Sequence, residues 1–436
     1  NLKWDEDTRS YTELFLKHLA LHISALAASE GVNKIQWSVS YPPSFSDIDK
    51  IEYSRFWQDV LQELSQSTGI KHKNPEINSR NLCLQDIAFA QYFADEEKKD
   101  LVYTTCINME RDISDIAIWE NNQIIHKCSV DLTGQDFFLQ FLKLNPTFAE
   151  KKFGLDPEEW EGLGTDTFKA KLDVWLRYRS KQWLDKNRSL QRRDPEFQGL
   201  NRLIAIGFAG LHYYVGMMLR VLDMENKYQH GKITPVYLGG QDSRFLNWLD
   251  ERGEFDRNSE MNELFSRMLS AGSNFRDSSE ITIPSQNPQD EIACGLVLNR
   301  TKLQGLGRKV KDPIISGESC YLNGKEFTAY QRLALEDCEE NITEFTIPYL
   351  VEVPKFLYAF HKAIKDLELE SITGLQGYDP SPATFDNHRL WQETQRELNK
   401  TLLNLKGDSK DIRPESTFIL GLKALLTVLG KQWASS

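Results

Sequence analysis

The sequence predicts an α/β fold over about two thirds of its length, followed by a smaller α+β module. Helical and strand patterns alternate through roughly the first 300 residues, as they do where helices connect the strands of a sheet. A short apolar strand at residues 233–238 runs directly into Gly239 and Gly240 and then into a predicted helix. After residue 302 the pattern changes to short strands followed by helices. We therefore expect three parts, at residues 1–135, 136–302 and 303–436.

The composition is that of an ordinary globular chain of 436 residues, with 27% charged and 40% hydrophobic residues. Its 52 basic and 64 acidic residues give a net charge of −12, which argues against a general nucleic-acid binder. The longest apolar stretch, residues 203–222, is interrupted by His212, Tyr213 and Tyr214, so no membrane span is predicted. The six cysteines stand singly, which indicates reduced thiols and a cytoplasmic location.

The first predicted helix carries two histidines one turn apart. Apolar residues recur from Leu14 to Leu26 at helical spacing, and Gly31 ends the pattern. His18 and His22 lie on a mainly apolar face, where they could pack or could ligate a metal. Because no third ligand is visible nearby, we favour packing.

The remaining elements follow from apolar periodicity and from turn residues such as Asn121-Asn122 and Asn323-Gly324. Strands are expected at 34–41, 100–108, 113–119, 124–130, 233–238, 281–283, 321–322, 326–328 and 342–353. Helices are expected at 51–68, 82–93, over most of 136–229, and at 243–249, 291–298, 354–367, 388–405 and 416–433.

Four segments, taken in order, resemble the actin-like ATPase superfamily, which includes actin, the seventy-kilodalton heat-shock chaperones and bacterial actins. They are residues 39–45, 84–90, 107–118 and 236–245. The match spans about residues 10–300. It implies two ribonuclease H-like lobes around a nucleotide cleft, with ATP or ADP as cofactor.

The third segment aligns without a gap on the family's second phosphate loop, Asp-Ile-Gly-Gly-Gly-Thr-x-Asp. In the family, the Asp acts through the metal and water, and the glycines let backbone N–H groups approach the β- and γ-phosphates. Here Asn108 replaces the Asp, and Glu110, Arg111 and Asp112 replace the glycines. Two carboxylates beside a polyphosphate would repel it, so we expect hydrolysis to be absent or feeble.

The fourth segment, Val-Tyr-Leu-Gly-Gly-Gln-Asp-Ser-Arg-Phe, resembles the family's adenosine motif. The resemblance implies that Gly239 and Gly240 bring the backbone against the nucleotide, that Ser243 caps the next helix, and that Arg244 lies beside it. Residues 287–296 resemble the Asn-Pro-x-Glu-x-Val-Ala-x-Gly helix that follows this motif in the chaperones.

Residues 131–138 resemble the chaperone segment Leu-Gly-Gly-Glu-Asp-Phe-Asp, with Gly134 and Asp136 retained. The resemblance therefore implies that Gly134 also helps to bind the nucleotide.

The resemblance also implies functional roles for two further residues, and each of them has a structural alternative. Gln85 matches the family's Gln or Glu that helps to place the attacking water, but it could equally cap a helix. Lys181 falls where the chaperones present charged side chains to the adenine and ribose. The basic run at 177–193, which contains Tyr178 and Arg179, is more simply a solvated helix face around two tryptophans, and we favour that interpretation.

The family's first phosphate loop, Asp-x-Gly-Thr, has no counterpart before Leu14, so no metal ligands are assigned. We expect a degenerate actin-like protein that serves as a nucleotide-responsive or structural scaffold in a bacterial assembly, with protein partners. The alternative is a working ATPase whose first phosphate loop lies upstream and supplies Mg²⁺ binding. A protein that binds no nucleotide at all is a third class.

Overall fold

The structure is a computed structural model, and the chain divides by its contacts into two units. The first unit comprises Asn1–Lys99 and Asp290–Leu306, and the second comprises Asp100–Gln289 and Gly307–Ser436. The described residues are 4, 8–42, 45–73, 82–110, 113–134, 136–137, 141–142, 145–153, 175, 180–250, 252–276, 279–298, 313–333, 341–369, 372, 389–405, 407–408 and 415–434.

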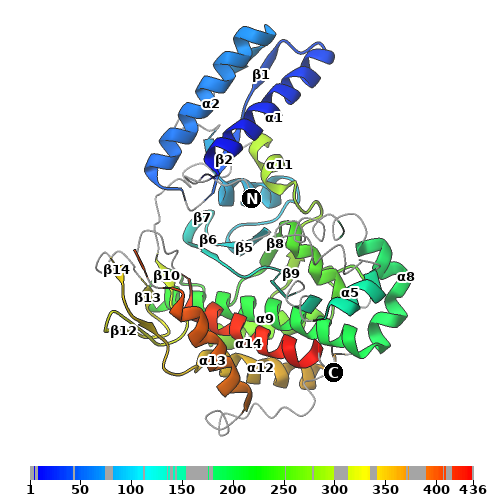
Figure 1. The fold of residues 1–436 in the computed structure, drawn as a ribbon, viewed down its shortest axis with the longest axis vertical. Helices are drawn as coiled ribbons and strands as arrows, with labels where there is room; N and C mark the ends of the chain where they lie inside the picture. Colours follow the sequence, from blue (N-terminus) through cyan, green and yellow to red (C-terminus); the bar gives the residue numbers. More distant parts are fainter. Residues whose placement is uncertain are drawn as a thin grey trace. The chain divides into compact units, whose positions relative to one another are not determined.

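The first unit combines helices with two short parallel strand pairs (Figure 1). The strand expected at 34–41 is two strands: β1 (Lys34–Gln36) pairs with β3 (Lys71–Lys73), and β2 (Val39–Tyr41) pairs with β4 (Leu82–Leu84). Its helices are α1 (Arg9–Ser29), α2 (Asp47–Thr68), α3 (Gln85–Asp95) and α11 (Glu291–Val297).

Helix α2 has clear signals at both ends. The Ser46 side chain and the Asp49 carboxylate form a reciprocal capping box at its start, and Gly69 ends it in the left-handed conformation. Ala20 of α1, Trp57 and Leu61 of α2, and Trp37 and Val39 beside them form one buried cluster. This cluster holds α1 and α2 to the strand layer.

The expectation that His18 and His22 pack against the protein is wrong, because both side chains are exposed. The buried positions of α1 are the small residues Thr12, Ala20 and Ser24, which form the face turned toward α2. The apolar residues of this helix outnumber the positions that face the core, so side chains such as Leu14 and Phe15 are exposed as well. Among the described residues, no three metal-binding side chains come together.

The second unit contains a five-stranded sheet in the order β7-β6-β5-β8-β9. The predicted hairpin is confirmed, with Asn121 and Asn122 at φ 51° and 61° between its strands. β8 and β9 lie parallel to β5. The strands are β5 (Tyr103–Glu110), β6 (Ile113–Glu120), β7 (Gln123–Val130), β8 (Val236–Gly239) and β9 (Thr282–Pro284).

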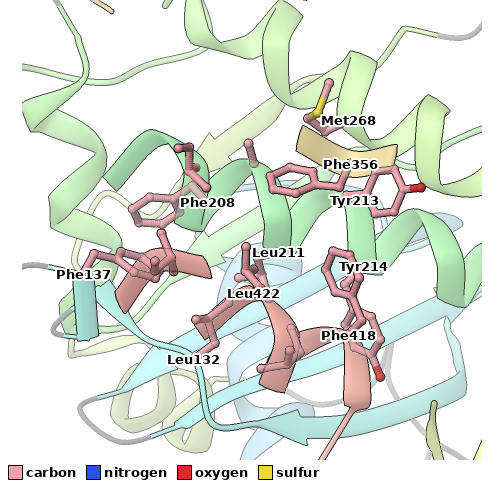
Figure 2. Packing of buried hydrophobic residues seen from close by; sticks show 14 of the residues in the cluster. Leu132, Phe137, Phe208, Leu211, Tyr213, Tyr214, Met268, Phe356, Phe418 and Leu422 are labelled. Atoms are coloured by element: carbon pink, nitrogen blue, oxygen red, sulfur yellow. The ribbon is translucent and has the colours of Figure 1, made fainter. Parts of the chain in front are cut away.

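Helix α9 (Pro195–Met224) is the centre of the second unit's core. It has the length and hydropathy of a membrane-spanning helix, but 94% of that window is buried inside the protein. In Figure 2, Leu422 and Phe418 of α14 (Thr417–Ala434) and Phe356 of α12 (Glu352–Leu367) lie against it. A third neighbour, α10 (Met261–Ser273), approaches so closely that a Cβ at Gly272 would lie 2.1 Å from the carbonyl oxygen of Tyr213.

Two further helices and a 3₁₀ helix are described between residues 146 and 248. They are α5 (Pro146–Phe153), α8 (Ser180–Arg193) and η1 (Gln241–Trp248). The helix expected at 243–249 is therefore a 3₁₀ helix that begins two residues earlier.

The C-terminal region has small sheets and three helices close to the expected positions. The strand expected at 342–353 is present only in part. Two-residue strands lie at Asn341–Ile342 and Phe345–Thr346, residues 347–351 form no strand, and helix α12 begins at Glu352. The buried Glu318 carboxylate accepts the backbone N–H groups of Val351 and Val353 and so satisfies the start of that helix. The elements are β10 (Ile314–Ile315), β11 (Cys320–Leu322), β12 (Lys325–Phe327), β13 (Arg332–Leu333), β14 (Asn341–Ile342), β15 (Phe345–Thr346), α13 (Arg389–Leu403) and β16 (Gly407–Asp408).

These C-terminal elements share one hydrophobic core with the sheet and α9. The mixture of helices and sheet supports the α/β class. A separate C-terminal module and the boundaries expected at residues 135 and 302 stay predictions.

His212 of α9 makes the stability of the second unit sensitive to acid. Its ring lies between the Phe208 carbonyl oxygen (2.8 Å) and the Thr282 hydroxyl (2.9 Å), and burial lowers its pKa to about 4. Since the unfolded chain binds a proton near pH 6.5 and the folded one does not, stability is complete above pH 6.5 and falls toward pH 4. We expect a loss of up to about 3 kcal/mol from this group.

Urea unfolding of the wild type and of His212→Gln at several pH values between 7 and 4.5 measures this effect. The variant loses this part of the acid dependence, even if it is less stable at pH 7. Identical pH slopes for the two proteins would contradict the assignment.

Candidate functional site

The carboxyl ends of β5 and β8 bring together residues that lie far apart in the sequence. Asn108 of β5 pairs in register with Gly239 of β8, and both are buried. The predicted phosphate-loop position and the predicted adenosine motif are therefore adjacent in the second unit. This is the edge of a sheet with parallel strands at which ligands commonly bind.

Gly240 makes a close contact at this edge. Its backbone has φ 79° and ψ 171°, a combination that is essentially restricted to glycine. A Cβ here would lie 2.4 Å from the Met109 carbonyl oxygen and 2.6 Å from Asn108 Oδ1. The space beside Gly240 is thus filled by the end of β5. This glycine therefore allows the turn after β8 to pack directly on β5.

Ser243 and Arg244 both use their polar groups within the protein. The Ser243 hydroxyl donates to the Gly240 carbonyl oxygen (2.7 Å), and Gly240 itself occupies the N-cap position that the resemblance implied for Ser243. Arg244 Nη2 donates to the Pro288 carbonyl oxygen (3.1 Å). This bond joins the Gly-Gly turn to the downstream segment that carries the Asn-Pro motif.

Gly134 lies on the other side of η1. A Cβ at this position would lie 2.2 Å from the Phe245 ring and 3.1 Å from the Asp242 carbonyl oxygen. The neighbouring Asp136 carboxylate accepts the Thr133 backbone N–H at 3.0 Å and so holds the local turn. The structure therefore places Gly134 beside η1, the element that follows Gly239 and Gly240 and carries Ser243 and Arg244. A nucleotide-binding role for these residues stays a prediction.

Two buried amide side chains at this edge have atoms without a hydrogen-bond partner among the described residues. They are Asn108 Oδ1 and Gln241 Nε2, on residues that are 4% and 6% exposed. Unsatisfied buried polar atoms are uncommon and frequently mark a site for water or a ligand. Sequence reasoning missed Gln241 because it looks like an ordinary turn residue; its place directly after the two glycines was the available signal.

The fit of a magnesium-bound triphosphate can be tested at this edge. Phosphate oxygens require N–H donors or a cation, as glycine-rich loops supply. The atoms nearest to the place that a Gly240 Cβ would take are instead the Met109 carbonyl oxygen and Asn108 Oδ1, both acceptors, and Glu110 ends β5. These groups do not fit a polyphosphate. Arg111 and Asp112 lie outside the described residues.

The other predicted site residues lie on other elements. Gln85 is the first residue of α3, in the first unit, and Leu84 is the N-cap residue of that helix, without a side-chain cap. Lys181 is exposed on α8. Tyr178 and Arg179 lie outside the described residues. The roles of Gln85 and Lys181 stay predictions.

Comparison with known proteins finds a distant structural similarity. No protein-family model matches the chain, and no curated protein matches its sequence. Among solved structures, the chain is similar to the ethanolamine utilization protein EutJ from Carboxydothermus hydrogenoformans, at 11% identity and a TM-score of 0.35. The match covers 67% of this chain and 75% of that one. It is a distant similarity to a protein of the actin-like ATPase fold.

The contact at Gly240 can be tested against a matched glycine. Gly324, in the β11–β12 turn, has φ 78° but no atom within 4 Å of the place that a Cβ would take, so Gly324→Ala introduces conformational strain alone. We expect it to cost about 1 kcal/mol in unfolding free energy. Gly240→Ala also forces the ends of β5 and β8 apart, and we expect about 3 kcal/mol or more. Urea denaturation measures both, and equal costs would contradict a close contact at Gly240.

Proposed function

We propose that the chain is a degenerate protein of the actin-like ATPase fold that does not hydrolyse ATP. It acts as a conformational or structural scaffold in a bacterial assembly, with proteins as its partners. The observation that carries this proposal is the acceptor-lined edge at Gly240, where Asn108 stands at the position of the family's catalytic Asp.

The electrostatics of that edge support the loss of hydrolysis. An amide at Asn108 carries no charge with which to hold a metal ion through water, whereas an aspartate does. A terminal phosphate brought to this edge would face the Met109 carbonyl oxygen and Asn108 Oδ1. Acceptor groups facing an anion in a partly buried site raise its energy, so neither phosphate binding nor transition-state stabilisation is favoured.

The nucleoside side of the site retains more ligand-binding features than the phosphate side does. Gly239, Gly240 and Arg244 hold the turn after β8, and the Gln241 amide has a buried donor without a partner among the described residues. An adenosine group offers ring nitrogens as acceptors for such a donor. If the site takes a nucleotide, its nucleoside therefore provides the binding energy, and the phosphates extend away from β5.

Titration with fluorescent adenosine, ADP and ATP, together with a phosphate-release assay, tests the proposal. We expect the three affinities to agree within about threefold, because the phosphates contribute little, and we expect no phosphate release above background. Gln241→Leu, which removes the buried donor, should weaken binding of all three, and Lys365→Gln, on helix α12, should leave it unchanged.

Two outcomes favour the other classes. Magnesium-dependent turnover that is lost in Gln85→Ala would contradict the proposal and indicate a working ATPase. Absence of binding by every ligand would leave a purely structural scaffold, which agrees with the loss of hydrolysis but not with a nucleoside site.

A further inference from the structure

Three lysines gather on one exposed face of the β1–β3 strand pair. Lys34 is in register with Lys71, and Gln36 is in register with Lys73. These four residues are exposed, while Ile35 is half-buried and His72 is buried on the opposite face, toward α2. Paired strands lie about 4.8 Å apart and alternate residues about 7 Å apart, so the three lysines form a small triangle.

The lysines of this triangle have no carboxylate partner among the residues that the structure describes. Elsewhere in the first unit, Arg9 pairs with Glu13 and Glu52, and Lys17 pairs with Glu63 at 2.7 Å. The charge of Lys73, and to a lesser extent that of Lys71, lowers the pKa of Lys34. Like charges placed opposite one another in a sheet are destabilising, so an anion on this face would relieve a real repulsion.

The geometry favours docking on the face rather than addition of a strand at the edge. The backbone N–H of His72, which points away from β1, already donates to Ser65 Oγ at 3.2 Å. The outer edge of β3 therefore lacks one of the donors that an added strand needs. Carboxylates at alternate positions of an extended segment recur about every 7 Å, which matches the spacing of Lys71 and Lys73.

The same face is poorly suited to single-stranded nucleic acid. Such binding combines cationic side chains with aromatic platforms on which bases stack, and these four positions contain no aromatic residue. The chain also carries a net charge of −12, which opposes long-range attraction of a polyphosphate. A short acidic segment contacts only the three lysines and is therefore repelled less by the net negative charge of the whole chain.

We propose that the face formed by Lys34, Gln36, Lys71 and Lys73 is a docking surface for an acidic, extended segment of a partner protein. This surface lies in the first unit and does not depend on the site at Gly240. It provides a protein-binding role that is consistent with a scaffold and holds whether or not a nucleotide binds.

Binding of a short fluorescent peptide with glutamates at alternate positions, measured by anisotropy with the whole protein at low salt, tests the proposal. The variant K34Q/K71Q/K73Q should bind about tenfold more weakly than the wild type, since each exposed ion pair contributes modestly. The control R55Q/K232Q/K365Q removes the same charge from scattered exposed positions and should change binding less than about twofold. Binding should also weaken as salt is added, because exposed charges are screened.

Thermal unfolding shows whether the triple variant still folds. Removing the repulsion within the triangle should leave the melting temperature equal to that of the wild type or above it. Failure of the wild type to bind, equal weakening in the two variants, or tighter binding of a single-stranded DNA of about 20 nucleotides would each overturn the proposal.

Discussion

The close approach of Gly240 to the end of β5 is the constraint on which the candidate site depends. The Met109 carbonyl and the Asn108 side chain occupy the volume that any side chain at residue 240 would need. This contact sets the distance between the carboxyl ends of β5 and β8. It therefore also sets the direction in which η1 continues from the sheet. Gly134 then fits under η1 because it too lacks a Cβ, which would overlap the Phe245 ring.

The same contact determines the chemistry of the edge. A glycine-rich phosphate loop exposes backbone N–H groups to its ligand, but here the neighbouring strand presents carbonyl and amide oxygens. A fold can therefore keep the backbone arrangement of a nucleotide site after the functional groups that bind the nucleotide have been replaced. The fold retains the turn, the strand pairing and the downstream link through Arg244, while the groups that would stabilise a phosphate are replaced.

Helix α9 supports this edge from within the second unit. Its glycines allow other helices to approach to contact distance, as Gly210 does with Leu422 and Gly216 with Leu269. Its single buried histidine is held between a carbonyl and a hydroxyl. Since α10, α12 and α14 all pack on α9, the C-terminal residues contribute to the same core as the sheet.

By itself, the sequence determined the features that depend on local periodicity and turn chemistry. The Asn121-Asn122 hairpin, helix α9 and the strand before Gly239 all follow from neighbouring residues, and so does the order of the motif segments. The tertiary structure alone decided which side chains face the core. His18 and His22 lie on an apolar helix yet are exposed, because only a narrow stripe of small residues contacts α2.

Distant partners also decided the start of α12, since its first backbone N–H groups are satisfied by Glu318, more than thirty residues earlier. A strand-like pattern at residues 342–353 could not reveal that partner. Likewise, the pairing of Asn108 with Gly239 and the unpartnered Gln241 amide depend on contacts across more than 130 residues, which no local pattern encodes.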